Sequence, residues 1–297
     1  MSRTRVSLAG IAVWLFAGAT LVTAQSTPAA GGDRTVTIHF EATVGDAPAA
    51  CGRTYSDVGR SGSSVTITDF RLYVMAVRLM RADGTDVPVA LSVDDLWQQD
   101  DVALLDFEDG TQTCANGTPE TRYIVEGRVP DGQYTGVRFR IGVPFARNHR
   151  DPTLQPSPLN LSRMFWTWNA GYKFLRLDLR TSGQPQGWVV HLGSTGCTPG
   201  ATPLDVPTTC RYPNDVSVDL PAFDPDRDVV RVDLSALLAE ADVDTNQPDT
   251  AAGCMSSRDD RDCTAIFQAI GLPFGEAPGG NQRVFSVARP SRAETKR

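Results

Sequence analysis

Short stretches in which hydrophobic and polar residues alternate run through most of the chain. Residues 35–44 (TVTIHFEATV) alternate and are rich in β-branched side chains, which is typical of a strand with one buried face. Residues 65–80 predict one long strand or two short ones, and the turn at Asp83-Gly84 predicts a hairpin that returns through residues 87–91. The same pattern predicts further strands over residues 122–128, 134–143, 173–180, 188–192, 216–220 and 229–232.

Helical patterns are confined to two short segments. Residues 234–241 follow Asp233, a good N-cap residue, and residues 263–270 precede Gly271, a good C-cap residue. Strands at this spacing, separated by Gly and Pro, favour an antiparallel sandwich or barrel. The fold that we expect is all-β: an antiparallel β-sandwich with Greek-key-like connections, a few short helices and disulfide bridges.

The first 24 residues have the pattern of a signal peptide. Arg3 and Arg5 precede an uncharged apolar run over residues 6–22, and Ala24 ends a small-residue cleavage motif. An uncleaved membrane anchor is the alternative, but the run is short for a bilayer span. We therefore expect cleavage after Ala24, a periplasmic or secreted protein, and no membrane span in the mature chain.

Behind this leader we expect one domain over residues 35–275. Residues 25–34 precede the first predicted strand, and residues 276–297 are rich in Gly, Pro and charged side chains. Both flanking segments are predicted to be flexible, because they lack a hydrophobic pattern that would bind them to a core. No internal repeat divides the chain.

Export changes how the six cysteines are interpreted. An even number of cysteines in an oxidising compartment indicates disulfides. Many pairings are possible; pairs close in the sequence are favoured, and they leave the two remaining cysteines to each other. No C-x-x-C motif occurs, so a zinc site built of thiolates is not favoured. The pairs that we expect are Cys51–Cys114, Cys197–Cys210 and Cys254–Cys263.

Charge and motifs argue against several classes of protein. With 28 basic and 35 acidic residues, a net charge of −7, the chain lacks the basic surplus that a nucleic-acid binder needs. Residues 193–196 (GSTG) do not match the G-x-S-x-G motif of serine hydrolases. Asp69, Asp106 and Glu108 are candidate catalytic carboxylates, but we interpret them as polar residues that support the fold at strand ends. We therefore do not expect an enzyme.

If all six cysteines form disulfides, other side chains must bind any metal. The chain has three histidines: His39 and His191 in predicted strands, and His149 in a loop. For each histidine alone, a structural hydrogen bond is the alternative role. As a set, imidazoles without thiolates suit copper or zinc.

Two tryptophans lie in the segment 164–168 (MFWTW). Trp166 and Trp168 are two residues apart, so on a strand both rings lie on one face, which Met164 shares. Core packing is the simplest interpretation of this pattern. Met164 also offers a soft thioether, a ligand that Cu(I) accepts.

An acidic loop at residues 242–249 (DVDTNQPD) resembles the start of a calcium-binding loop. Gln247 stands where an EF-hand has glycine, and Gly253 stands where it has its last glutamate. We therefore interpret the loop as a solvated acidic segment.

Several segments together resemble a known family. The most specific part is W-x-W at residues 166–168 followed by G-Y-K-F at residues 171–174. The others are FRLYV (70–74), LLDFE (104–108), IGVP (141–144), NH (148–149), PLN (158–160) and HLGSTGC (191–197), with Cys210 after them. In order and spacing, over roughly residues 35–275, they resemble the MbnP family of exported copper-binding proteins, also described as four-cysteine proteins of a paired metal system.

This resemblance implies copper binding, as Cu(I), outside the cytoplasm. The family's four cysteines resemble those of the first two expected pairs, which makes Cys254 and Cys263 an additional pair. Family members are paired with a dihaem enzyme of the cytochrome c peroxidase/MauG type, called MbnH. That partner oxidises the first Trp of W-x-W to kynurenine, and copper binding depends on the product. Carried over to this sequence, the modified residue is Trp166.

Ring opening makes chemical sense as a way to create a ligand. An indole has only an N–H donor, whereas kynurenine offers an arylamine nitrogen and a carbonyl. With one or two imidazoles it would form a low-coordinate site that Cu(I) tolerates. The metal ligands that we expect are His39, His191 and kynurenine from Trp166, followed by His149 and then Met164.

We therefore expect an exported copper-binding protein with a role in copper homeostasis. The alternative is a non-catalytic β-sandwich interaction module that binds calcium, carbohydrate or a protein partner. In that case W-x-W would be part of the core and would remain unmodified.

Overall fold

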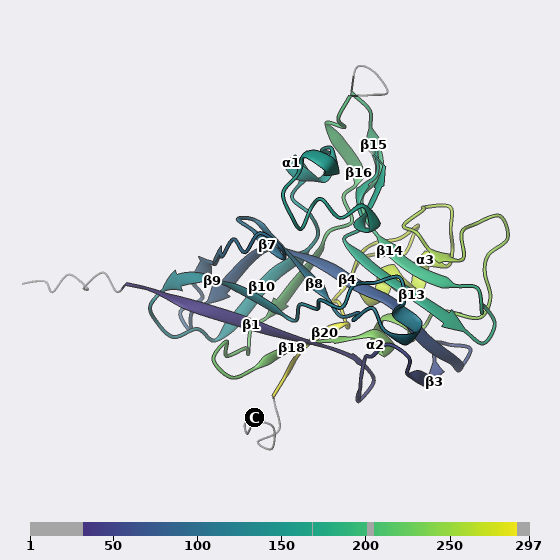
Figure 1. The fold of residues 1–297 in the computed structure, drawn as a ribbon, viewed down its shortest axis with the longest axis horizontal. Helices are drawn as coiled ribbons and strands as arrows, with labels where there is room; N and C mark the ends of the chain where they lie inside the picture. The colour runs from purple at the N-terminus through teal and green to yellow at the C-terminus, as the bar shows by residue number, and fades with distance from the viewer. Residues whose placement is uncertain (1–31, 168, 201–204, 290–297) are drawn as a thin grey trace, which may run out of the picture. The chain divides into compact units, whose positions relative to one another are not determined.

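The computed structural model describes residues 32–167, 169–200 and 205–289. They form two large β-sheets and two two-stranded hairpins (Figure 1). The predicted signal peptide, Trp168 and residues 290–297 lie outside the described residues. No helix in the described ranges is long and apolar enough to cross a membrane.

The smaller of the two large sheets has six strands, in the order β20-β18-β1-β9-β6, with β2 paired to β1. These strands are β1 (Asp33–Val44), β2 (Ala47–Pro48), β6 (Ala90–Leu91), β9 (Ile124–Pro130), β18 (Val229–Asp233) and β20 (Phe285–Ala288). Strand β1 lies in the middle, between β18 and β9.

The larger sheet has ten strands, with the main order β17-β10-β4-β13-β14-β19. Its long strand β4 also pairs with β3, β5 and β8, and β8 pairs with β7. The strands are β3 (Thr54–Val58), β4 (Ser63–Met80), β5 (Asp86–Pro88), β7 (Gln98–Gln99), β8 (Val102–Asp106), β10 (Gly136–Ile141), β13 (Leu175–Thr181), β14 (Trp188–Leu192), β17 (Val216–Leu220) and β19 (Gly253–Cys254).

The remaining elements are short. Strand β11 (Phe165–Thr167) pairs with β12 (Gly171–Tyr172), and β15 (Thr195–Thr198) pairs with β16 (Thr209–Tyr212). In Figure 1, β15 and β16 lie beside α1 and stand apart from both large sheets. The helices are α1 (Phe145–Asn148), α2 (Leu234–Leu238) and α3 (Cys263–Ala269), and the 3-10 turns are η1 (Gln112–Cys114), η2 (Pro152–Leu154) and η3 (Ser162–Met164).

The two large sheets bury their facing sides against each other. Phe139 on β10 is fully buried and makes edge-to-face contacts with Phe40 on β1 and Phe285 on β20, with ring centroids 5.6 and 5.7 Å apart. These rings join the ten-stranded sheet to the six-stranded one. The all-β sandwich that the alternating pattern predicts is therefore confirmed.

Some local predictions need correction. Two strand pairs, β1–β18 and β14–β19, are parallel rather than antiparallel. The predicted hairpin strand 87–91 divides, because Val87 pairs with Leu79 on β4 whereas Leu91 pairs with Gly127 on β9, in the other sheet. The prediction of a flexible tail from residue 276 is wrong for β20, which pairs with β18 and buries Phe285 in the core.

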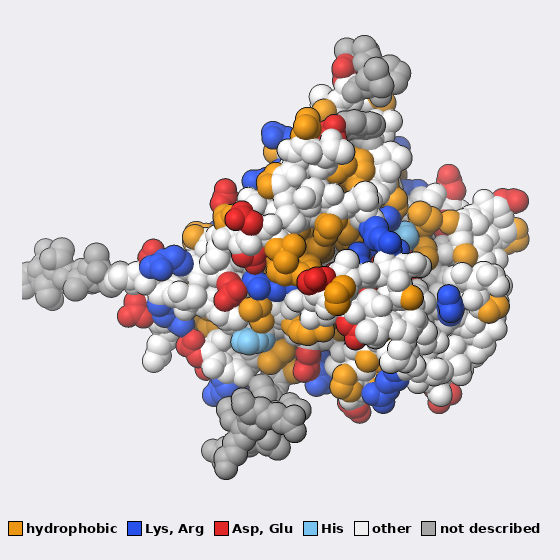
Figure 2. Space-filling model, in the orientation of Figure 1, with side chains coloured by type: hydrophobic (Ala, Val, Ile, Leu, Met, Phe, Trp, Pro, Cys, Tyr) orange, Lys and Arg blue, Asp and Glu red, His pale blue; other side chains and the backbone are white. Residues whose placement is uncertain are grey.

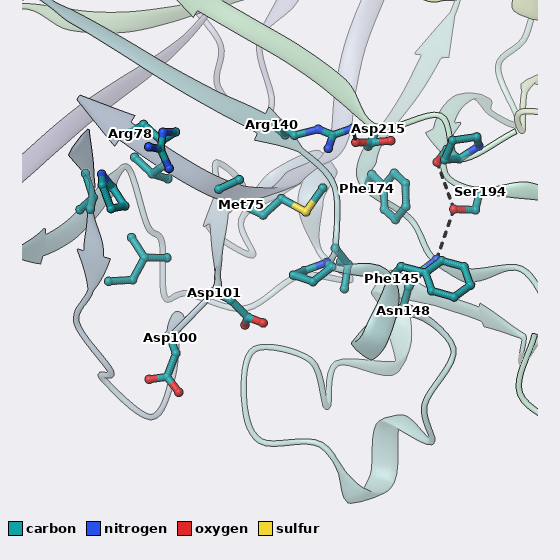
Figure 3. Close-up of a pocket in the computed structure, with 18 residues that line it drawn as sticks. Met75, Arg78, Asp100, Asp101, Arg140, Phe145, Asn148, Phe174, Ser194 and Asp215 are labelled. Atoms are coloured by element: carbon teal, nitrogen blue, oxygen red, sulfur yellow. Dashed lines mark hydrogen bonds and ion pairs between the residues drawn. The ribbon is translucent and has the colours of Figure 1, made fainter. Parts of the chain in front are cut away.

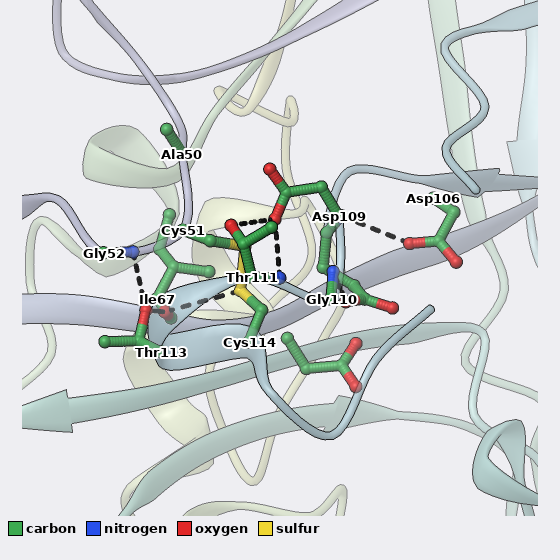
Figure 4. Close-up of a disulfide and its surroundings, with 12 residues drawn as sticks. Ala50, Cys51, Gly52, Ile67, Asp106, Asp109, Gly110, Thr111, Thr113 and Cys114 are labelled. Carbon is green, nitrogen blue, oxygen red and sulfur yellow. Dashed lines mark hydrogen bonds between the residues drawn. A yellow bond between two sulfur atoms is a disulfide. The ribbon is translucent and has the colours of Figure 1, made fainter. Parts of the chain in front are cut away.

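The cysteines pair as the sequence analysis expected: Cys51–Cys114, Cys197–Cys210 and Cys254–Cys263. The first disulfide joins the loop after β2 to η1 (Figure 4). Beside it, Gly52 N donates to Thr113 Oγ1 at 2.7 Å, and that hydroxyl donates to the Ile67 carbonyl on β4 at 2.6 Å. Three disulfides are typical of extracellular or periplasmic proteins.

Replacing Phe139 with alanine tests the packing between the sheets. We expect Phe139→Ala to lower the free energy of unfolding by about 3–5 kcal/mol, because it removes a buried ring that both sheets contact. Leu154→Ala, at a side chain that is 83% exposed, is the control and should change it by less than about 0.5 kcal/mol. Urea denaturation measures both variants, and a loss below about 1 kcal/mol for Phe139→Ala would contradict the packing described.

Candidate metal centre

A row of charged and polar side chains crosses four strands of the ten-stranded sheet. Asp106 on β8 pairs in register with Arg71 on β4, Arg71 with Arg176 on β13, and Arg176 with His191 on β14. Residues directly opposite each other on paired strands point to the same face of a sheet. The four side chains therefore form one row.

This row lies on the face that points away from the six-stranded sheet. Phe139 points toward that sheet, so its neighbour Arg140 and the cross-strand partner of Arg140, Met75, point away. Arg71 precedes Met75 by four residues on β4 and therefore points the same way. Arg71 and Asp106 are nevertheless almost fully buried, so other segments of the chain cover the row.

Ion pairs connect the row from one end to the other. Arg71 Nε lies 3.0 Å from Asp106 Oδ2 and 3.5 Å from Asp69 Oδ1, and its Nη2 donates to Glu108. Arg176 Nη1 lies 3.2 Å from the other oxygen of Asp69. The same guanidinium pairs with Asp178 at 2.5 Å. This arrangement supports the interpretation of Asp69, Asp106 and Glu108 as residues that support the fold.

The carboxylates of this network outnumber the guanidinium groups. Burial raises the pKa of Asp69 to about 6 and the pKa of Asp106 to about 7, and the nearby Arg176 and Arg71 offset the burial only in part. Both acids therefore hold their protons at a pH at which an exposed aspartate has lost its own.

His191 stands at the end of the row and is held in one tautomer. Its Nε2 lies 2.6 Å from Asp178 Oδ1, and a carboxylate can only accept, so Nε2 carries the hydrogen. Burial lowers the pKa of His191 despite the opposing effect of Asp178, so the ring is neutral at neutral pH. Nδ1 then has a free lone pair, and this buried atom has no hydrogen-bond partner among the described residues.

Trp166 lies next to His191, with ring centroids 6.4 Å apart. Its Nε1 is also buried without a hydrogen-bond partner in the described part of the chain. The indole packs on Gly193, where a Cβ atom would lie 2.4 Å from Trp166 Cζ3 and 2.7 Å from the Tyr172 carbonyl oxygen. Only glycine leaves room for the ring there.

Lys173 holds the Trp166 segment against the sheet. Its backbone N–H donates to the Met164 carbonyl at 2.7 Å, and its Nζ donates to the Arg163 carbonyl at 2.7 Å. Burial and the nearby Arg176 lower the pKa of Lys173 to about 8. The side chain of Met164 is fully buried in the hydrophobic core.

The other two histidines lie elsewhere. His39 is exposed on β1, between the core residues Ile38 and Phe40, so it points outward from the six-stranded sheet. His149 is fully buried beside the Cys197–Cys210 disulfide. In Figure 2 the histidine surface does not form one continuous patch. Of the predicted ligands, the structure brings together Trp166 and His191.

A pocket of about 620 Å³ lies on the same side of the large sheet but does not include this pair. Met75, Phe145 and Phe174 line it, and Arg140 pairs with Asp215 at its edge (Figure 3). Hydrophobic side chains also gather in the middle of the face shown in Figure 2. The orphaned polar atoms, rather than this pocket, mark the candidate metal centre.

Asp178, Lys173 and Gly193 are the site residues that the sequence analysis did not identify. The alternating segment 173–180 (KFLRLDLR) places Arg176 and Asp178 on the face opposite the leucines, a pattern that is also typical of a solvent-exposed face, so it does not by itself indicate a buried polar site. The close approach of Trp166 to Gly193 has no signal in the sequence either, because it depends on how two distant segments pack.

The raised pKa of Asp106 gives a testable pH dependence. The folded protein keeps this proton between about pH 4 and pH 7, where the unfolded chain has lost it, so this contribution to stability is lost as the pH rises through about 7. Asp106→Asn removes the titration. Between pH 5 and pH 8 the melting temperature of the native chain should fall, and that of the variant should fall by a few degrees less. An equal fall in both proteins would contradict the burial of Asp106.

Comparisons with known proteins identify the family of the chain and a solved structure with a similar fold. The family model described as MbnP matches residues 33–256. A solved structure, MbnP from Methylosinus trichosporium, has a TM-score of 0.78 and 29% sequence identity; the match covers 88% of this chain and 100% of that one. No curated protein sequence matches the chain. Because the family model covers most of the sequence and the solved structure has the same fold, the chain belongs to the MbnP family.

Proposed function

We propose that this protein binds Cu(I) outside the cytoplasm through His191 Nδ1 and a kynurenine formed from Trp166, with a role in copper homeostasis. Membership of the MbnP family supports a copper-related role. The observation that carries the proposal is the pair of buried nitrogens, on adjacent rings, that lack hydrogen bonds among the described residues. A buried polar atom without a partner is costly, and a metal ligand needs a free lone pair.

Before oxidation, His191 and Trp166 together offer a metal ion only one nitrogen ligand. Nδ1 of His191 has a lone pair, whereas Nε1 of Trp166 has only its hydrogen. Oxidation breaks the C2–C3 bond of the indole and adds two oxygen atoms, and hydrolysis then releases C2 as formate. The kynurenine that remains has one carbon less and one oxygen more than tryptophan, and it carries an arylamine. Two nitrogen donors, with no thiolate or carboxylate between them, suit Cu(I) better than a hard cation. In this proposal a dihaem enzyme of the cytochrome c peroxidase/MauG type catalyses the oxidation, and a peroxide is the oxidant that is reduced to water.

The geometry narrows the ligands that we propose. We leave His39 and Met164 out of the proposed set, because His39 points outward from the other sheet and Met164 is packed in the hydrophobic core. We also leave out His149, because its Nε2 lies 3.4 Å from Cys210 Sγ and 4.0 Å from Cys197 Sγ, beside a different pair of groups. Asp178 holds His191 in the tautomer that leaves Nδ1 available.

Producing the protein with and without the dihaem partner tests the proposal. With the partner, we expect a mass gain at Trp166 equal to one oxygen minus one carbon, and one copper ion per chain. Alone, the chain should stay unmodified and bind little copper. Trp166→Phe should abolish loading, and Trp97→Phe is the control. Equal copper loading without any oxidation would contradict the kynurenine ligand, and no loading after correct oxidation would favour an interaction module.

A second variant tests how His191 is positioned. Asp178→Asn keeps the size of the side chain but removes the obligate acceptor, so the imidazole can change tautomer and Nδ1 is no longer held free. We expect copper affinity of the modified protein to fall about 10–100-fold. Asp219→Asn, at a half-exposed carboxylate paired with Arg138, is the control. Unchanged affinity in Asp178→Asn, measured by competition with a Cu(I) chelator, would exclude this role.

A further inference from the structure

His149 and the Cys197–Cys210 disulfide form a cluster of soft ligand atoms apart from the site proposed above. His149 Nε2 lies 3.4 Å from Cys210 Sγ and 4.0 Å from Cys197 Sγ. All three atoms lie within 4.8 Å of one another. A single ion could contact all of them once the sulfurs are thiolates.

The nitrogen of His149 that lies near the sulfurs is the unprotonated nitrogen of the ring. Asn148 Oδ1 accepts from the Tyr172 backbone N–H at 2.9 Å, which fixes the orientation of the amide, so Nδ2 of Asn148 faces His149 Nε2 at 3.2 Å. Because an amide NH₂ only donates, His149 Nε2 is the acceptor and carries no hydrogen. Nε2 is thus the ring nitrogen that has the lone pair, and an ion bound there would take the place of the Asn148 hydrogen bond.

This disulfide is also the most accessible of the three. Cys51, Cys114, Cys254 and Cys263 are all buried. Cys197 and Cys210 are half-buried and pair directly across the β15–β16 hairpin, which belongs to neither large sheet. Access to the sulfur controls the rate of thiol–disulfide exchange, so a reductant reaches this bond first.

We propose that reduction of Cys197–Cys210 creates a second site for a thiophilic d¹⁰ cation, with the two cysteine thiolates and His149 Nε2 as ligands. A dithiol reductant supplies two electrons and two protons: the S–S bond breaks, two thiols form, and the reductant leaves as its own disulfide. On binding, the ion displaces both thiol protons. Two thiolates and one imidazole are a ligand set that selects zinc-like or Cu(I) ions over Mg²⁺ or Ca²⁺.

The test uses the chain made without any dihaem partner, so that Trp166 is unmodified and the result does not depend on the proposed copper site. Limiting dithiothreitol, removed under nitrogen, should reduce this disulfide first. Alkylation and peptide mapping should then label Cys197 and Cys210 but not the buried cysteines. Labelling of the buried pairs first would overturn the proposal.

Cd²⁺ is the probe, because thiolate ligands give it an ultraviolet charge-transfer band. We expect one Cd²⁺ per reduced chain and none on the oxidised chain, and bound Cd²⁺ should protect Cys197 and Cys210 from alkylation. His149→Gln should weaken binding by more than about tenfold, whereas His39→Gln should leave it unchanged. Cys197→Ser/Cys210→Ser should bind none.

Two results would overturn the site. One is a reduced native chain that binds no more Cd²⁺ than the oxidised chain. The other is His149→Gln binding Cd²⁺ as tightly as the native sequence. If His149→Gln does not fold, protection of both thiols by one Cd²⁺ in the native chain decides the proposal, because the absence of protection would show that the thiols do not share an ion.

Discussion

The buried guanidinium of Arg71 is the interaction on which the outer face of the large sheet depends. It neutralises carboxylates from its own strand, from β8 and from the loop that follows β8: Asp69, Asp106 and Glu108. A buried network of this kind adds little net stability compared with apolar packing, but removing one partner leaves buried charge unpaired and costs about 3–5 kcal/mol. The network also favours a single register of β4 against its neighbouring strands, because a slip of one residue would point Arg71 into the hydrophobic core.

The same network determines where His191 points. Asp69 lies between Arg71 and Arg176, Arg176 holds Asp178, and Asp178 orients His191. The imidazole is thus held by side chains of the ten-stranded sheet, which suits the ligand role that we propose for it. Trp166 instead lies on the two-stranded β11–β12 hairpin, outside both large sheets. The ring opening that we propose would therefore change a side chain on this hairpin and not one on a strand of either large sheet.

The sequence was sufficient to predict most core strands and the pairing of the cysteines, because both depend on local patterns. Strand β14 was predicted with its observed bounds, and Asp233 caps α2 as expected. Local patterns could not predict whether His39 and His191 lie close together. Alternation shows that His39 faces one side of its strand, but which sheet that strand joins depends on pairing with distant segments. Strand β20 was missed for the same reason, since it forms by pairing with β18, which lies more than 50 residues earlier in the sequence.

The two buried histidines, His191 and His149, differ in their hydrogen bonds: one donates and the other accepts. This difference affects how well each ring can bind a cation. His191 donates to a carboxylate, whose negative charge makes the remaining ring nitrogen a better ligand for a cation. His149 accepts from a neutral amide, which adds no negative charge. At the copper site that we propose, Asp178 would therefore stabilise a cation bound to His191 even in the fully oxidised chain. A cation at His149 needs negative charge from elsewhere, and in the described residues the atoms near enough to supply it are the sulfurs of Cys197 and Cys210 after reduction.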